Sequence, residues 1–402
     1  MDDSCAGMPE MKAHKRRPGR RRWGENLFIG ASPYVSGLCY SIFRVEPYAG
    51  CPMGCVYCYT RWYPSKGGRQ QVWDFERAAS EVYSAGLVPV PFRLSTLTEP
   101  FQPLEEERRL SLKVLNAALR TRYPLIVNTR SALISRDPWR ALLQQLGEEG
   151  LVVLQVSVST LSEKHRALEP KTPSPRDLLS AASKLAERGV PLVVRYEPLI
   201  PGLSDVESEA ERAFEAFAEA GAKHVIVEFL RIERERLDFF KKLALDAAPY
   251  SLEWETYSIE KEKGPVKPPL DYRREKARML RDLAMKKGLT FATCKEGFFD
   301  LHTSPECCGV YLLGVRHLLR PTLAEVYRMV RERGSMKVHE VVGELRRMPG
   351  WVAGSRVDAY PRPLRKGLRW HENVLASMLR SGQAARVTPL LKFKNGAISP
   401  SL

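Results

Sequence analysis

The chain has 402 residues, of which 44% are hydrophobic, and it carries a net charge of +16. This length and apolar content are sufficient to bury one large core of the size of a (β/α) barrel. The sequence has no run of 18 or more apolar residues and no charged-then-apolar leader, so we expect neither a membrane span nor a secretory signal, and a cytoplasmic location. Eight cysteines are dilute in a chain of this length and fall into two clusters, which favours metal binding in a reducing compartment over disulfides.

The positive charge is concentrated in two terminal segments. Residues 1–22 carry seven Lys/Arg against three Asp/Glu, and residues 354–402 carry nine against two, so +11 of the +16 lies there. Basic termini commonly meet nucleic acid phosphates, although a solvated basic surface gives the same pattern. Residues 1–26 lack apolar periodicity and are predicted to form a disordered basic arm.

From residue 41 to residue 229 the chain is predicted to alternate strands and helices. The expected strands are 41–48, 92–96, 125–128, 151–158, 192–196 and 224–229, and the expected helices are 74–85, 104–120, 138–146, 175–188 and 205–220. Short β-rich runs separated by helices indicate parallel strands with right-handed crossovers. Six such units predict an α/β fold, a partial (β/α)6 TIM-like barrel, with its chemistry at the carboxyl ends of the strands.

The loop after the first strand contains three cysteines, Cys51, Cys55 and Cys58, in the spacing CxxxCxxC. A structural zinc site or a saturated iron–sulfur cluster has four protein ligands, whereas three thiolates on a four-iron cluster leave one iron open to a small molecule. A zinc knuckle with a distant fourth ligand, or three unrelated buried thiols, is the alternative.

The segment PYAGCPMGCVYCYTR resembles the cluster loop of radical S-adenosylmethionine (SAM) enzymes, in the subgroup that contains spore photoproduct lyase and DNA repair photolyase-like relatives. The resemblance implies a [4Fe-4S] cluster on the three cysteines and SAM on the open iron. It also implies that Tyr57 lies against the adenine and that the backbone at Tyr59 receives the adenine amino group. In such enzymes an electron, from a donor such as ferredoxin or flavodoxin, cleaves SAM to a 5′-deoxyadenosyl radical that abstracts hydrogen from a substrate.

The resemblance continues through polar residues at the ends of the expected strands. The stretch LSTLTEPFQPLEEERRL resembles the turn where the family holds the SAM amino group, and an acid such as Glu99 suits an ammonium. Ser157 is expected to reach ribose hydroxyls, and Arg195 has the charge for the SAM carboxylate. The SAM-binding residues implied on the strand ends are Thr98, Glu99, Thr129, Arg130, Ser157, Arg195 and Glu197.

The substrate is predicted from the same resemblance and from the basic termini. Both favour repair or modification of a nucleic acid, DNA or RNA, and the competing hypothesis is modification of a protein, a peptide or a small metabolite. Where the lyase carries a hydrogen-donating cysteine, this chain has Ser95 and Thr96, which do not donate hydrogen atoms easily. This departure argues against reversal of a thymine dimer by the lyase route.

The remaining sequence is predicted to extend the barrel. We expect the barrel to occupy residues 27–260, a cysteine-containing extension residues 261–320, and a basic helical region residues 321–402. A further strand at 289–293 leads to Cys294, Cys307 and Cys308, which would bind a second iron–sulfur cluster or a zinc ion near the barrel mouth, with His302 or Cys39 completing the set. The alternative is an inert buried cysteine pair plus a lone cysteine.

Overall fold

The computed structural model describes most of the chain beyond the expected basic arm, which lies outside the described residues. These are residues 27–31, 38–40, 43–62, 68, 70–257, 264–352 and 355–401.

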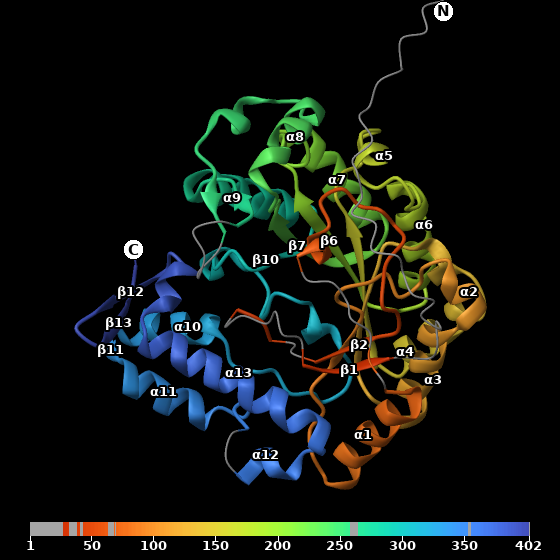
Figure 1. Cartoon of the computed structure of the whole chain (residues 1–402), viewed down its shortest axis with the longest axis vertical. Coiled ribbons are helices and arrows are strands. Elements are labelled where there is room, and N and C mark those ends of the chain that lie inside the picture. Colours follow the sequence, from red (N-terminus) through yellow and green to blue (C-terminus); the bar gives the residue numbers. More distant parts are fainter. Residues whose placement is uncertain are drawn as a thin grey trace, which may run out of the picture.

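One eight-stranded sheet forms the centre of the molecule (Figure 1). Its strands, in order, are β1 (Phe28–Ala31), β2 (Phe43–Glu46), β3 (Phe92–Leu94), β4 (Leu125–Thr129), β5 (Val152–Val158), β6 (Leu192–Leu199), β7 (Ala222–Phe229) and β10 (Thr290–Thr293). All neighbours are parallel except β1 and β2, and the edge strands β1 and β10 do not pair with each other within the described residues. The predicted partial barrel with six central units is confirmed, whereas the antiparallel strand β1 was not predicted.

Helices cover the outer face of the sheet. They are α1 (Val72–Ser84), α2 (Leu104–Arg108), α3 (Leu110–Thr121), α4 (Trp139–Glu148), α6 (Pro175–Ala186), α7 (Glu207–Glu219) and α9 (Leu270–Lys286). The short helices α5 (His165–Leu168) and α8 (Leu237–Leu243) instead pack in a separate apolar cluster with residues of the cysteine loop. The single helix predicted at 104–120 is in fact α2 and α3, separated by Arg109 with φ 54°. The break has a local cause, because the buried Glu105 carboxylate accepts hydrogen bonds from the backbone N–H groups of Ser111 and Leu112 and so caps α3.

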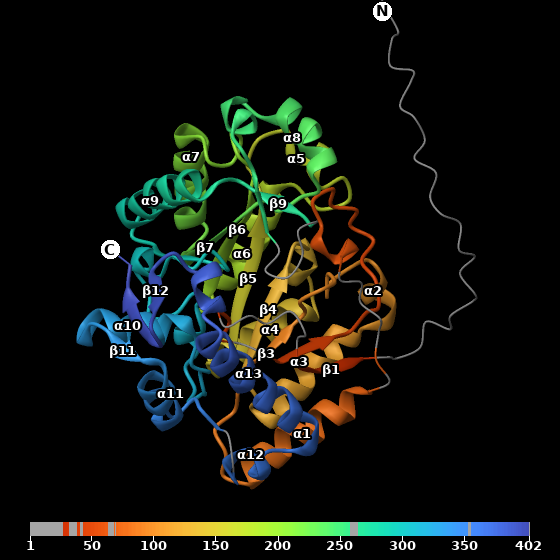
Figure 2. The ribbon, with the colours of Figure 1, turned by 60° about the vertical axis from the view of Figure 1, so that its left-hand side comes forward.

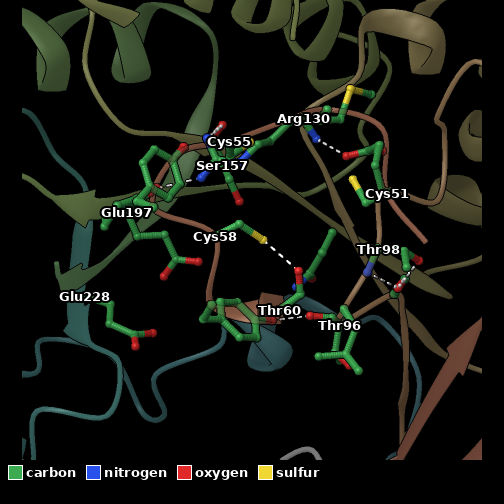
Figure 3. A pocket seen from close by; sticks show the side chains of 18 of the residues that line it. Cys51, Cys55, Cys58, Thr60, Thr96, Thr98, Arg130, Ser157, Glu197 and Glu228 are labelled. Carbon is green, nitrogen blue, oxygen red and sulfur yellow. Dashed lines mark hydrogen bonds between the residues drawn. The ribbon is translucent and has the colours of Figure 1, made fainter. Parts of the chain in front are cut away.

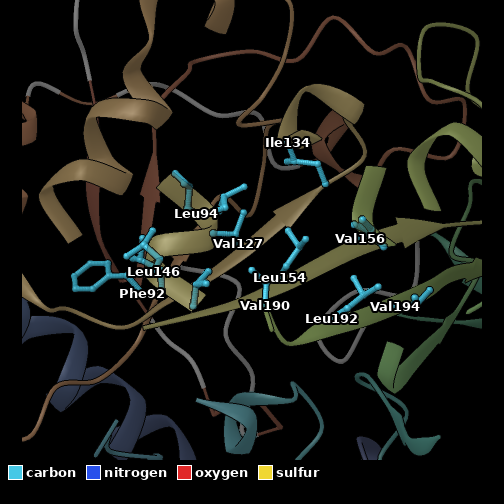
Figure 4. Packing of buried hydrophobic residues seen from close by; sticks show 14 of the residues in the cluster. Phe92, Leu94, Val127, Ile134, Leu146, Leu154, Val156, Val190, Leu192 and Val194 are labelled. Carbon is cyan, nitrogen blue, oxygen red and sulfur yellow. The ribbon is translucent and has the colours of Figure 1, made fainter. Parts of the chain in front are cut away.

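The two faces of the strands differ in composition because side chains alternate along each strand. Outward residues such as Val127, Leu154 and Val194 are fully buried in the large apolar cluster under the helices (Figure 4). Inward residues form a second, smaller apolar cluster low in the lumen, with Ile126, Val153, Val193, Ile226 and Ala292 from five neighbouring strands. Two positions further along β4, β5 and β6 the inward residues are polar, so the lumen becomes hydrophilic toward the carboxyl ends.

The C-terminal region packs on the side of the barrel near β1 and β10 (Figures 1 and 2). It contains α10 (Leu323–Arg333), α11 (Val338–Arg347), α12 (Ser355–Ala359), α13 (Arg362–Arg380) and a small sheet of β11 (Met336–Lys337), β12 (Leu391–Lys394) and β13 (Ala397–Pro400). This region has its own apolar cluster. A separate two-stranded ribbon joins β8 (Glu255–Thr256) to β9 (Val266–Lys267). None of the helices in the described part of the chain has the length and apolarity required to span a bilayer.

Candidate active site

The carboxyl ends of the strands and the cysteine loop enclose an open cavity with about 1000 Å³ of empty space, counted out to its mouth. The predicted site residues that line it are Cys51, Cys55, Tyr57, Cys58, Tyr59, Thr98, Glu99, Thr129, Arg130, Ser157 and Glu197 (Figure 3). Arg195 is not among the lining residues.

The geometry of the three loop thiols fits a cluster better than a single ion. One tetrahedral ion with metal–sulfur bonds of about 2.3 Å holds two thiolates about 3.8 Å apart. Among the described residues, Cys51, Cys55 and Cys58 do not form a set of sulfur atoms within 4.8 Å of one another, although all three line one cavity. A four-iron cluster does not require this proximity, because each of its thiolates binds a different iron. Burial raises the pKa of the Cys55 thiol to about 12, so metal binding there must displace a proton.

Glu46 holds the turn that follows β3 in place through hydrogen bonds. Its carboxylate is fully buried and accepts hydrogen bonds from the backbone N–H groups of Thr96 and Leu97 at 2.7 and 3.0 Å. It also pairs with Arg44 at 3.1 Å. The hydroxyl groups that donate to it belong to Ser95, Thr96 and Thr98. Because Glu46 ends β2, one residue ties the start of the cysteine loop to the Ser95–Glu99 turn.

Two further buried glutamates hold tyrosines of the loop region. Glu105 accepts a hydrogen bond from the Tyr48 hydroxyl, and Glu169 accepts one from the Tyr57 hydroxyl. Burial opposes ionisation of Glu169, but the Arg130 guanidinium at 2.9 Å and several hydroxyl groups hold its pKa below the usual value. Motif spacing does not reveal these roles, because Glu105 and Glu169 lie 57 and 112 residues from their tyrosine partners.

Glu99 occupies the position expected for an acid at the end of the β3 turn. It accepts hydrogen bonds from the Thr129 hydroxyl at 2.6 Å and from the backbone N–H of Arg130 at 2.7 Å. Burial raises the pKa of Glu99, and these hydrogen bonds oppose the increase. No Lys, Arg or His of the described residues forms an ion pair with its carboxylate, so the site contains one buried acid without a cationic partner.

Arg195 lies behind the cavity wall. Its guanidinium binds Glu197 through two nitrogens, at 2.5 and 2.8 Å, and also donates to Gln155 at 3.2 Å. Arg93 donates to the same Gln155 oxygen at 3.1 Å. The predicted contact of Arg195 with a ligand carboxylate therefore competes with an existing bidentate ion pair.

One wall of the cavity was not predicted from the sequence. Glu228, at the end of β7, lines the cavity with Arg231 and forms ion pairs with Arg231 and, at 3.8 Å, with Lys295. Figure 3 shows Glu228 and Glu197 on the side opposite Cys51 and Thr98. The sequence did contain a signal for Glu228, because it lies at the end of a predicted strand. Each of the remaining central strands also has a polar residue at that end.

The second group of cysteines lies in and against the apolar cluster of the lower lumen. Cys294 follows β10, packs against this cluster and lies 3.6 Å from an Arg195 nitrogen. Cys307 and Cys308 are buried within the cluster, and the Cys307 carbonyl contacts His224 near the start of β7. His302 shares a hydrogen bond with Thr293 rather than with a cysteine.

Comparison with known proteins relates both the sequence and the fold to radical SAM proteins. Residues 45–215 match the sequence model of the Radical SAM superfamily. The radical SAM Nalpha-GlyT isomerase of Pseudomonas phage M6 is 24% identical over 274 residues, which cover 64% of this chain and 55% of the isomerase. An uncharacterised protein of Acidianus two-tailed virus is 26% identical over 232 residues, covering 53% of this chain and 72% of the viral protein. A point mutant of spore photoproduct lyase has the same fold, with a TM-score of 0.52 and 17% identity over 68% of this chain and 81% of the lyase.

The fold and the site define an enzyme built on a partial (β/α) barrel with a three-cysteine loop at the carboxyl ends of its strands. The match of residues 45–215 identifies this part of the chain, which contains the cysteine loop, as a radical SAM domain. A domain of this superfamily implies an iron–sulfur cluster and SAM.

Proposed function

We propose that Cys51, Cys55 and Cys58 hold a [4Fe-4S] cluster and that the adjoining cavity binds SAM. The observation that carries the proposal is the pairing of the charged side chains that line the cavity. Glu197 and Glu228 are each paired with a guanidinium, whereas Glu99 has no ion-pair partner among the described residues. A buried, unpaired carboxylate suits the ammonium group of SAM.

The other lining residues supply orientation and exclude water. Tyr57, held by Glu169, is proposed to lie against the adenine, and Ser157 to bind the ribose. Thr98, Thr129, Arg130 and Glu197 complete the set of proposed polar contacts, with the backbone at Tyr59. Apolar lining from Met53, Leu97, Pro198, Phe229 and Leu230 is proposed to exclude water around the bound ligand. When bound, the cluster and SAM supply one-electron chemistry able to remove a hydrogen atom from a substrate, with electrons from a small redox protein such as ferredoxin or flavodoxin.

The proposed substrate is a nucleic acid. Residues 321–402 carry 15 Lys/Arg against six Asp/Glu, a net charge of +9, and most of these basic side chains are exposed. On α13, Arg362 and Lys366 are one turn apart, exposed, and without an acidic partner among the ion pairs of the described residues. A folded basic surface of this kind binds phosphates in a salt-dependent manner.

The competing substrate class is a peptide, a protein or a small metabolite. The cavity favours it in one respect, because three carboxylates (Glu99, Glu197 and Glu228) and two guanidiniums (Arg130 and Arg231) line it. Such a wall suits an amino or zwitterionic group better than a phosphate.

Two measurements test these proposals separately. Anaerobic reconstitution should give about four irons per chain and reductive cleavage of SAM. Triple replacement of Cys51, Cys55 and Cys58 by alanine should abolish both, and SAM cleavage by that variant would contradict the proposed cluster site.

Nucleic acid binding is measured as a function of salt concentration, with polyglutamate as an unrelated acidic polymer. Arg362→Glu with Lys366→Glu should lower the slope of log affinity against log salt by about 1.8 on duplex DNA, if each residue contacts one phosphate. The matched control on α9, Arg278→Glu with Lys286→Glu, makes the same change of charge on an exposed helix face and should leave the slope unchanged. Absence of binding above the polyglutamate level at low salt would favour the peptide or metabolite substrate.

A further inference from the structure

The lower lumen contains a second group of donor atoms that the proposed SAM site does not use. One donor atom each from Glu306, Cys307 and Cys308 lies within 4.8 Å of the other two. All three residues are buried, with exposed fractions of 1%, 6% and 3%. They belong to a segment that crosses the floor of the barrel, where the backbone N–H of Gly314 donates to Gly150 just before β5. The group therefore lies in an enclosed site at the end of the lumen opposite the cavity mouth.

We propose that Glu306, Cys307 and Cys308 bind one zinc ion, which fastens the floor segment inside the barrel. The two sulfur atoms are 3.6 Å apart. This separation is close to the roughly 3.8 Å of two thiolates on one tetrahedral zinc, and it is far from the roughly 2.05 Å of a disulfide. A multi-iron cluster binds its thiolates through different irons, so the short separation also distinguishes this site from the cluster loop. The adjacent cysteines reach this geometry without further movement of their sulfur atoms.

The surrounding charges match such an ion. Zinc with two thiolates and one carboxylate has a net charge of −1. Arg93, which is buried, donates to the Cys308 sulfur at 2.9 Å and otherwise to the amide oxygens of Gln155 and Asn128. Among the described residues no carboxylate pairs with Arg93. A buried guanidinium requires a nearby negative charge, and the zinc complex provides one.

The buried carboxylate of Glu306 requires a positive charge nearby, as Arg93 requires a negative one. Glu306 accepts hydrogen bonds from the backbone N–H groups of Cys308 and Tyr311, but no Lys, Arg or His of the described residues forms an ion pair with it. A buried acid of this kind is costly unless a cation lies beside it or it remains protonated. A zinc ion between the carboxylate and the two thiolates supplies the cation, and soft thiolate ligands favour zinc over magnesium or calcium.

The proposed ligand set excludes Cys294. That thiol lies beside Arg195, whereas Cys308 lies beside Arg93, and Gln155 bridges the two guanidiniums. Cys294 also does not belong to the group of donor atoms within 4.8 Å. The three protein donors leave the fourth position of a tetrahedral ion to a small ligand such as water.

Metal analysis of the full chain, purified anaerobically, tests the proposal without using activity. We expect about one zinc per chain besides the cluster iron, a loss of at least tenfold in zinc for Cys308→Ser, and unchanged zinc for Cys294→Ser as the matched control. The triple alanine variant of Cys51, Cys55 and Cys58 should lose its iron and keep its zinc, so this site and the proposed cluster site fail independently.

Three outcomes would overturn the inference: wild-type protein without zinc, about eight irons per chain after reconstitution, or zinc lost equally from Cys294→Ser. If Cys308→Ser does not fold, Glu306→Gln and removal of zinc from the wild type by a chelator replace it. Chelation should lower the melting temperature and expose residues 305–320 to hydrogen exchange, and an unchanged exchange pattern after zinc removal would contradict the fastening role.

Discussion

Replacement of Glu46 by glutamine should weaken SAM binding, although Glu46 itself does not line the cavity. The substitution keeps the shape of the side chain and removes its charge. It leaves the Arg44 guanidinium, which is almost fully buried, without its carboxylate at 3.1 Å. It also replaces one acceptor oxygen by an N–H donor in a place where hydroxyl and N–H groups converge.

The expected magnitude follows from these contacts. Removing one partner of a buried ion pair costs about 3–5 kcal/mol, and each buried donor left without an acceptor costs about 1–3 kcal/mol. The hydroxyl groups can rotate to accept from the new amide, so we expect the free energy of unfolding to fall by about 3–5 kcal/mol in total. A looser Ser95–Glu99 turn should raise the SAM dissociation constant roughly tenfold, which corresponds to about 1.4 kcal/mol.

Equilibrium dialysis of SAM, iron analysis and urea unfolding measure the three quantities on the same preparation. Glu372→Gln is the matched control, because Glu372 forms a buried ion pair with Arg320 in the C-terminal region, far along the chain from the loop. We expect the control to lose similar stability and to keep wild-type affinity for SAM. If both variants lose stability but neither changes the SAM dissociation constant, the proposed positioning role of Glu46 is wrong.

Two other predictions concern buried charge elsewhere. Burial raises the pKa of Asp205 to about 6, so its proton is held more tightly in the folded state; stability from this group is fully present below the unfolded pKa of about 3.9 and is lost as the pH rises through 6. Between pH 4 and pH 7 the wild type should therefore lose about 2–3 kcal/mol of its free energy of unfolding through this group, and Asp205→Asn should not show this loss. Denaturant titrations of the two proteins in parallel measure the difference. For Arg320 and Glu372, the single change Glu372→Gln should cost about 3–5 kcal/mol, whereas Arg320→Met combined with Glu372→Leu should recover most of that loss; equal losses in the single and double variants, measured by urea unfolding, would contradict this.

The order of elements was predictable because local patterns determine it. Apolar runs bounded by helices predicted β4 to β7 to within a few residues, and the CxxxCxxC loop was placed correctly at the carboxyl end of β2. Strand-end polar residues such as Thr129 and Ser157 line the cavity because parallel strands end at one edge of the sheet.

Contacts between distant segments were not predictable in the same way. In the sequence, Glu46 and Glu105 cannot be distinguished from ordinary surface acids. Only the folded chain shows that both are buried and that they accept hydrogen bonds from residues 50 or more positions away. Likewise Arg195 is on the strand where it was expected, but the pairing with Glu197 two residues later turns it away from the cavity lining. The deep position of Cys307 and Cys308 depends on a floor segment that periodicity does not reveal.

The paired charges of the cavity restrict how a nucleic acid could be a substrate. Each guanidinium at the wall is already neutralised, Arg130 by Glu169 and Arg231 by Glu228. A phosphate that entered the cavity would have to displace a carboxylate from one of these partly dehydrated ion pairs. If the substrate is a nucleic acid, its phosphates must therefore bind outside the cavity, and only a base or a sugar can enter. A base inside a duplex reaches such a cavity only after unstacking, at a cost of a few kcal/mol. Single-stranded DNA or RNA should therefore stimulate SAM cleavage at least tenfold more than a duplex of the same sequence, compared at equal phosphate occupancy. Equal stimulation by the two forms would mean that the base remains stacked, and the cavity would then have to accept a substrate other than a nucleic acid base.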